Sequence, residues 1–196
     1  MDVFEAISTT RAMRRLDPSR DVPDGALRTI IEAATKAASR GNRQDVRWLV
    51  VREPEKRRRL GELYLECIRL ALPRDEEAGQ TDPAAARLLR SLWYLAYHIG
   101  EAPALILACA PGEAQASVFP GVQNLMLAAR ALGLGTTLTT THRCNESKVK
   151  QLLGIPDEVN TFCMIPVGYP LGRWSEAKRK PVDEVAFWDG WGRTAP

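Results

Sequence analysis

Apolar residues recur along this chain at helical and strand spacings, which predict alternating helices and strands. One such stretch places apolar residues three or four positions apart, on one face of a helix: Leu27, Ile30, Ile31 and Ala34. Pro54 opens a second stretch with the same periodicity, because proline is tolerated in the first turn of a helix. We therefore expect helices near 3–7, 24–38, 54–71, 83–99, 123–132 and 145–154.

Short β-prone runs separate these helices and predict about four central strands. Residues 104–109 form one continuous apolar run, which is typical of a strand that is covered on both faces. The other expected strands are 47–52, 136–141 and 161–167. Residues 73–83 are rich in proline and acidic residues and predict a loop. No linker divides the chain, so 1–196 is predicted to be a single domain.

Composition narrows the class of protein without naming a function. The chain has 196 residues, with 45% hydrophobic and 26% charged residues, as in ordinary soluble globular proteins. Its net charge of +3 is too small to indicate nucleic acid or a membrane surface as the partner. The longest apolar run, 103–111, is too short to span a bilayer, and the first residues lack a secretory signal pattern. We expect a cytoplasmic protein.

The four cysteines indicate reduced thiols and no metal site. They are widely spaced, no pair has metal-ligand spacing, and three lie in apolar stretches that read as core: Cys67, Cys109 and Cys163. The fourth, Cys144, follows His142 closely, but we interpret this proximity as coincidence. No hydrolytic nucleophile motif accompanies either histidine, and Gly133-Leu134-Gly135 lacks the third glycine of a dinucleotide-binding turn.

Two polar segments near the N-terminus carry the candidate chemistry. Arginines crowd residues 11–15, and guanidinium groups grip phosphate through paired hydrogen bonds. One helix later, Asn42 and Gln44 supply carboxamides that both donate and accept hydrogen bonds. The simpler interpretations are a solvated basic loop and a helix C-terminal turn around Gly41. A phosphate-bearing heterocyclic cofactor accounts for both segments.

The end of the chain predicts a docking arm. Trp174, Phe187, Trp188 and Trp191 follow the last expected strand. Large aromatic side chains are unfavourable in water, so a tail that carries them is expected to pack on protein. We predict that 171–196 docks on its own domain or on a second subunit.

Five blocks of the sequence, in order, resemble the FMN-dependent nitroreductase family. The blocks cover nearly the whole chain, and five blocks in the same order as in the family are more specific evidence than any one block alone. The blocks are Thr10-Arg11-Ala12-Met13-Arg14, Ala37 to Val46, Gln123 to Thr136, Leu153 to Pro156 with Ile165 to Pro170, and Arg179 to Val185. Thr10 and Ala12 stand where the family has arginine and serine, so the remaining arginines carry more of the phosphate grip.

This resemblance implies an α+β fold and a cofactor site. The family fold is a central, mainly antiparallel sheet of about four to five strands surrounded by helices, in an intertwined homodimer with FMN at the interface. It also implies that the C-terminal arm, 171–196, crosses the partner subunit. The cofactor-binding residues implied by the resemblance are Arg11, Ala12, Met13, Arg14, Asn42, Gln44, Leu138, Thr139, Thr140 and Arg179.

The roles implied for these residues leave the chemistry to the cofactor. Arg11, Arg14 and Arg179 would neutralise the phosphate, Asn42 and Gln44 would contact the ring or ribityl chain, and 138–140 would pass beside the ring. No protein residue is therefore expected to be catalytic in its own right. The segment 70–95 is expected to form a wall over the substrate pocket.

The activity implied is electron transfer from NAD(P)H through FMN to a small electron-poor acceptor, such as a nitroaromatic or a quinone, by a ping-pong mechanism. Relatives with the same fold oxidise natural-product rings, remove halogens or consume the flavin itself, and the sequence does not separate these alternatives. A third hypothesis is a non-enzymatic basic interaction module that uses Lys56-Arg57-Arg58-Arg59. We instead interpret that run as the exposed face of a helix.

Overall fold

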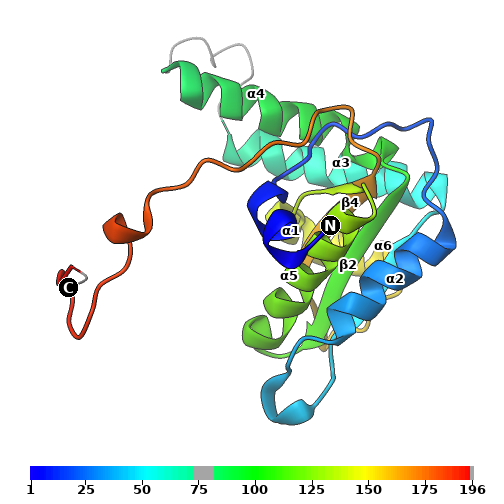
Figure 1. The fold of residues 1–196 in the computed structure, drawn as a ribbon. Coiled ribbons are helices and arrows are strands. Elements are labelled where there is room, and N and C mark those ends of the chain that lie inside the picture. Colours follow the sequence, from blue (N-terminus) through cyan, green and yellow to red (C-terminus); the bar gives the residue numbers. More distant parts are fainter. Residues whose placement is uncertain (73–81, 195–196) are drawn as a thin grey trace.

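The computed structural model describes residues 1–72 and 82–194, and it shows an antiparallel sheet between two layers of helices (Figure 1). Four strands in the described part of the chain form this sheet, in the order β1 (Arg47–Val51), β2 (Ala104–Pro111), β4 (Val159–Gly168) and β3 (Gly135–Thr136). All three pairings are antiparallel. The expected α+β class and the number of strands are confirmed, whereas the expected loop at 73–83 lies mostly outside the described residues.

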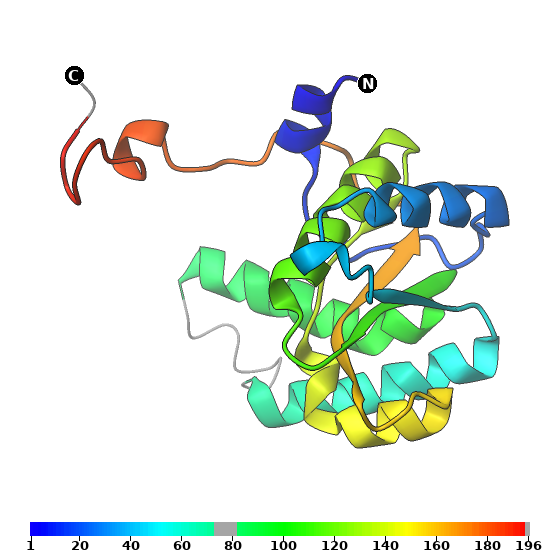
Figure 2. The ribbon, with the colours of Figure 1, turned by 90° about the horizontal axis from the view of Figure 1, so that it is seen from below.

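Six α-helices surround the sheet in the described ranges. They are α1 (Val3–Thr9), α2 (Asp24–Thr35), α3 (Pro54–Ala71), α4 (Pro83–His98), α5 (Gln115–Ala131) and α6 (Glu146–Leu153). Short 3-10 turns occupy η1 (Arg40–Asn42), η3 (Ile99–Glu101), η4 (Thr141–Asn145) and η5 (Val182–Glu184). Figures 1 and 2 show α2 and α5 on one side of the sheet and α3 with α6 on the other.

Strand β2 is apolar throughout because both of its faces are covered. Ile106 and Ala108 belong to the core cluster that includes residues of α2 and α5, whereas Leu105 and Leu107 belong to the cluster that includes residues of α3 and α4. Successive side chains of a strand point to opposite faces, so a strand between two helical layers needs apolar residues at every position. Every residue from 104 to 110 is buried, as the continuous run predicts.

Two predicted element boundaries are wrong. Helix α5 begins at Gln115 instead of residue 123 and carries Pro120 in its interior, although proline usually interrupts a helix. Its buried residues before and after Pro120, such as Val118 and Val122, pack in the core and compensate for the lost hydrogen bond. The expected strand 136–141 is reduced to β3 and one bridge between Thr139 and Met164, because the chain then turns into η4.

The arginine-rich segment is held against the edge of the sheet at β3. The Met13 backbone N–H donates to the Thr136 carbonyl at 2.9 Å, and Leu16 forms a bridge with Pro170. Gly135 makes this approach possible, because a Cβ atom there would lie 2.9 Å from the Met13 Cβ. The backbone of residues 13–16 is therefore tied to the edge of the sheet.

The C-terminal arm has two parts. The first part lies on its own domain: the Arg130 guanidinium stacks over the Trp174 ring at 4.3 Å, and the Ala177 N–H donates to the Ser8 carbonyl at 2.9 Å. Beyond this point the chain extends away from the domain (Figures 1 and 2). There Trp191 is 94% exposed, and its ring contacts the Phe187 ring in a tilted arrangement with ring centroids 5.1 Å apart. Within 1–72 and 82–194, no helix has the length and apolarity needed to cross a membrane.

Candidate functional site

The arginine-rich segment and the arm line one cavity of about 510 Å³. The lining residues come from the segment after α1, from α4 and from the arm, and they are Arg11, Ala12, Arg14, Arg87, Ser175, Glu176, Ala177, Lys178 and Arg179. Five of these described lining residues are cationic and one is acidic, so the cavity is strongly positive. It brings together Arg11, Arg14 and Arg179, which the sequence predicts to share a phosphate site.

Each predicted arginine of this cavity has a different environment. Arg14 is half-buried, and its Nη1 lies 3.4 Å from Ser91 Oγ. Burial lowers the pKa of the Arg14 guanidinium, while the nearby Tyr64 hydroxyl opposes this effect. Arg11 is exposed and hydrogen-bonds to Ser175 of the arm. Arg179 is exposed, and its Nη1 donates to the Lys178 carbonyl at 2.9 Å.

Helix α4 supplies two residues that sequence reasoning missed. Arg87 lines the cavity, and Ser91, four residues later, is the hydrogen-bond partner of Arg14. Residues at this spacing lie on the same side of a helix. Within the described ranges no carboxylate forms an ion pair with Arg87. The helical periodicity of α4 could identify this shared face, but only the tertiary structure places it beside the arginine-rich segment.

The residues that flank the arginines have structural contacts. Met13 is 7% exposed, and its side chain packs beside Gly135 rather than lining the cavity. The Thr10 hydroxyl donates to the Ala6 carbonyl at 2.6 Å and so completes the last turn of α1. Ala12 lines the cavity but has no side-chain donor. The polar contribution of this segment to a ligand thus rests on Arg11 and Arg14.

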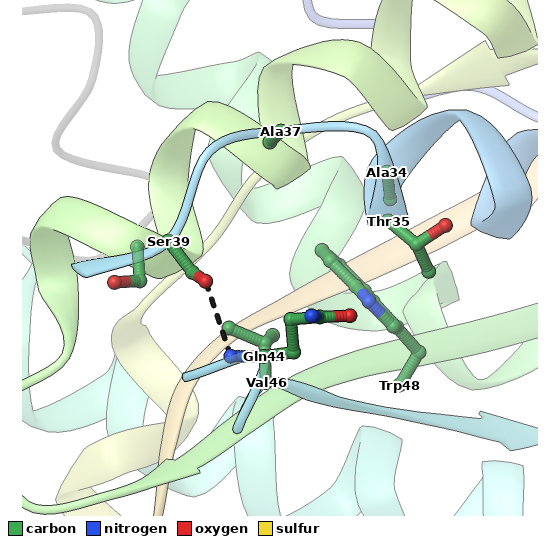
Figure 3. Close-up of a pocket in the computed structure, with 8 residues that line it drawn as sticks. Ala34, Thr35, Ala37, Ser39, Gln44, Val46 and Trp48 are labelled. Atoms are coloured by element: carbon green, nitrogen blue, oxygen red, sulfur yellow. Dashed lines mark hydrogen bonds between the residues drawn. The ribbon is translucent and has the colours of Figure 1, made fainter. Parts of the chain in front are cut away.

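One of the two predicted carboxamides, Gln44, lines a second, smaller pocket of about 130 Å³, which we call the carboxamide pocket (Figure 3); Asn42 is not part of its lining. Gln44 contributes its side chain, which Figure 3 shows directed toward the ring of Trp48. The Gln44 Nε2 donates to Asn42 Oδ1 at 3.1 Å, and its backbone N–H donates to Ser39 Oγ at 3.1 Å. The Asn42 side chain therefore orients the carboxamide of Gln44.

The backbone of this loop is held in an uncommon conformation. Gly41, Asn42 and Gln44 have φ angles of 58°, 54° and 52°. The left-handed region is accessible to glycine and tolerated by asparagine, but it costs about 1–2 kcal/mol for a residue such as glutamine. The interpretation of Gly41 as left-handed is confirmed, although α2 ends earlier, at Thr35. Such strain is concentrated at functional sites.

The segment expected beside a flavin ring is ordered by a hydroxyl network. Thr139 is buried, its backbone pairs with Met164, and its Oγ1 lies 3.1 Å from the Tyr64 hydroxyl. Leu138 and Thr140 are exposed on either side of it. Thr139 therefore fixes the segment, while its neighbours face solvent. The lining of the large cavity includes none of these three described residues.

In a single chain the predicted site is divided. The sets of residues that line the arginine cavity and the carboxamide pocket have no member in common. The cation cavity can bind a phosphate group, because several guanidinium groups converge on it. The carboxamide pocket can hydrogen-bond a polar heterocycle but has no arginine in its lining.

Comparisons with known proteins agree with this combination of fold and residues. The sequence model of the Nitroreductase family matches residues 7–169. A Thermus thermophilus protein named NADH dehydrogenase is 28% identical over 231 aligned residues, covering 96% of each chain. Among solved structures, the FMN- and NADPH-dependent nitroreductase NfnB of Sphigopyxis sp. strain HMH has a TM-score of 0.76, with 20% identity and coverage of 97% of this chain and 100% of that one.

A second solved structure has the same fold and a different named activity. Iodotyrosine deiodinase bound to FMN and 3-iodo-L-tyrosine has a TM-score of 0.78, with 20% identity and coverage of 97% of this chain and 100% of that one. The family model covers most of the chain and contains the arginine-rich segment, the carboxamide loop and all four strands. The chain therefore belongs to the nitroreductase family.

Proposed function

We propose that this protein is an FMN-dependent oxidoreductase that takes electrons from NAD(P)H and delivers them to a small electron-poor acceptor, such as a nitroaromatic or a quinone. The observation that carries the proposal is the positive cavity in which Arg11, Arg14 and Arg179 converge. Family membership supports the same conclusion. The structural neighbour NfnB, an FMN- and NADPH-dependent nitroreductase, supports the cofactor and the electron donor.

The residues present fit FMN at both ends. The phosphate would bind in the cation cavity, where half-buried Arg14 gives the strongest single interaction because water screens it least. The polar edge of the flavin would meet Asn42 and Gln44, whose side chains are already oriented by their mutual hydrogen bond. When bound, FMN would supply the hydride and electron transfer chemistry. The protein's own contribution is to bind, orient and shield the ligand.

A second copy of the chain is part of this proposal. The arginine cavity and the carboxamide pocket lie apart in one chain, so a homodimer that joins them would complete the site. The exposed aromatic residues at the end of the arm, Trp188 and Trp191, support this arrangement, because they have little cover on their own domain. The apolar residues Phe4 and Ile7 of α1 are also exposed and offer a further surface for the partner.

Dehalogenation of an aromatic substrate is the second candidate function. The similarity to iodotyrosine deiodinase suggests it, because that protein uses the same fold with FMN and 3-iodo-L-tyrosine bound. Both reactions deliver electrons from reduced flavin to an aromatic acceptor. Measuring turnover of nitroaromatics, quinones and 3-iodo-L-tyrosine, each with NADH and with NADPH, separates the two candidate functions. Failure of every acceptor with an FMN-loaded protein would contradict the proposed activity without contradicting the cofactor.

The cofactor proposal is tested first by the purified protein itself. We expect a yellow protein that releases FMN on denaturation, or a colourless one that takes up added FMN. A protein that neither contains nor binds FMN would refute both flavin functions. It would leave a non-enzymatic module as the explanation of the basic residues.

Substitution of Arg14 tests which cavity holds the phosphate. Arg14→Ala should weaken FMN binding by about 1.5–3 kcal/mol, because a charged hydrogen bond to phosphate is lost. The matched control is Arg15→Ala, since Arg15 stacks over Tyr94 at 4.4 Å and does not line the cavity. Equal FMN dissociation constants for the two variants, measured by fluorescence quenching, would move the phosphate site elsewhere.

Truncation of the arm tests the partner. A chain that ends at residue 181 keeps every residue that lines the arginine cavity and loses Trp188 and Trp191. We expect the full chain to sediment as a dimer and the truncated chain to dissociate more readily and to bind FMN more weakly. A truncated dimer as tight as the full one would contradict docking of the arm on the partner.

A further inference from the structure

Two cysteines that are distant in the sequence meet where α3 contacts η4. Cys67 lies on α3 and is 1% exposed, whereas Cys144 lies in η4 and is exposed to solvent. The residue after Cys144, Asn145, donates through its side chain to Glu66, the residue before Cys67, at 3.0 Å. Helix α3 and η4 also pack against each other, and the Cys144 side chain is one of the groups that raise the pKa of the Cys67 thiol. Two free thiols are therefore neighbours, and one of them is open to solvent.

The surrounding contacts keep these thiols together. The Asn145 side chain donates to Glu66 Oε2 at 3.0 Å, immediately beside Cys67, and to a carbonyl of α3 at 3.0 Å. One turn before Cys67, the Tyr64 hydroxyl lies 3.1 Å from Thr139 Oγ1. Helix α3 and the segment 139–145 are thus joined by residues that flank Cys144 in the segment and precede Cys67 in the helix, which limits how far the sulfur atoms can separate.

We propose that Cys144 and Cys67 form a reversible intramolecular disulfide when the protein meets hydrogen peroxide. The Cys144 sulfur attacks one peroxide oxygen, the O–O bond breaks, and a sulfenic acid forms with release of one water. The Cys67 sulfur then attacks the Cys144 sulfur, the S–S bond forms, the S–O bond breaks, and a second water leaves. In balance, two thiols are oxidised to one disulfide and one hydrogen peroxide is reduced to two waters.

The environments of the thiols set the order of these steps. Cys144 is accessible and reacts first with a dissolved oxidant. Burial, together with the neighbouring Cys144, raises the pKa of the Cys67 thiol to about 12, so Cys67 stays protonated until the sulfenic acid forms beside it. Burial also raises the pKa of Cys109 to about 11 and that of Cys163 to about 12, and both lie inside the core. These two thiols are protected from the same oxidant.

The disulfide would link the two elements that fix the segment beside the proposed flavin site. Element η4 follows directly after Leu138 to Thr140, and Tyr64 and Cys67 lie on the same side of α3. A covalent link here removes freedom from the segment that carries Thr139. The disulfide itself requires no flavin, so its formation can be tested independently of the proposed function.

The experiment counts thiols in the purified full chain before and after peroxide treatment. Remaining thiols are alkylated, and mass spectrometry of the intact and digested protein then counts and locates them. We expect the loss of two of the four thiols, a Cys67–Cys144 linked peptide, and full recovery after dithiothreitol. The protein should keep the mobility of a single chain on a non-reducing denaturing gel.

Paired variants identify the reacting thiols. Cys67→Ala and Cys144→Ala should each abolish the disulfide, whereas Cys109→Ala with Cys163→Ala should retain it. A covalent dimer through Cys144, a linked peptide that lacks Cys67, or Cys144 oxidised beyond sulfenic acid while Cys67 stays free would overturn the proposal. If the variant that lacks Cys109 and Cys163 does not fold, the linked peptides of the unaltered chain still identify which two cysteines react.

Discussion

A single buried histidine should make this protein sensitive to mild acid. His142 has no exposed surface, and its Nε2 lies 3.1 Å from the Thr161 hydroxyl. That hydroxyl donates to Glu146 Oε1 at 2.8 Å, so it accepts a hydrogen bond from Nε2–H and fixes the neutral tautomer that carries its hydrogen on Nε2. The other ring nitrogen, Nδ1, is buried without a hydrogen-bond partner. A second proton, which would bind at Nδ1, therefore has no hydrogen-bond acceptor to donate to in the described part of the folded protein.

The size of the effect follows from the pKa. Burial lowers the pKa of His142 from 6.5 to about 4, with Glu146 opposing the shift and Arg143 adding to it. Below pH 6.5 the unfolded chain gains a proton that the folded chain does not bind, so stability is lost as the pH falls toward 4. The free energy of unfolding should fall by about 2 kcal/mol between pH 7 and pH 5 and by roughly 3 kcal/mol in all.

Urea unfolding followed by circular dichroism at pH 7, 6 and 5 measures this change. Burial raises the pKa of Glu146, but its hydrogen bonds to Thr161 and the nearby Arg143 and Lys150 lower it by more, so the net shift is away from this range. His142→Asn should remove most of the pH dependence even if the variant is less stable throughout. His98→Gln is the matched control, because it removes the other histidine, which is partly exposed beside Glu101. An unaltered slope in His142→Asn would refute the reasoning.

Two further predictions concern packing. Gly100→Ala should destabilise the fold by about 1–3 kcal/mol, because the added Cβ would lie 2.8 Å from the Arg57 carbonyl oxygen. A Cβ at Gly25 would meet nothing within 4 Å, so Gly25→Ala should be neutral or stabilising. Thermal unfolding of the two variants measures this difference. Trp174→Ala removes the ring on which Arg130 stacks. Trypsin should then cleave the arm faster, while the melting temperature of the domain changes little. An unchanged rate of cleavage would show that Trp174 does not hold the arm on the domain.

Much of the fold could be predicted because its elements have strong local signals. The apolar run of β2 and the helical periodicity of α3 reflect burial on both faces of a strand and on one face of a helix. The start of α5 was not predictable from the same signals. Pro120 disfavours a helix locally, and only the packing of Val118 and Gly121 against the core outweighs that preference.

The candidate site was predicted in its parts but not in its arrangement. The residue types of Arg11, Arg14, Asn42 and Gln44 indicate phosphate and heterocycle recognition wherever they lie. The placement of the two arginines in one cavity and of Gln44 in another is a property of the folded chain, as is the contribution of Arg87 from α4. No local pattern encodes which helix faces a distant loop, because that contact depends on how all the layers pack.

The sequence by itself determined the class of fold, the family resemblance and the chemistry of the candidate site, because these depend on side-chain type and on short-range periodicity. Only the tertiary structure decided that Cys67 meets Cys144 and that His142 is buried with one unpaired nitrogen. It also decided that the first part of the arm lies on its own domain. These features arise from contacts between residues far apart in the chain, whose free energy is set by packing and desolvation rather than by local preference.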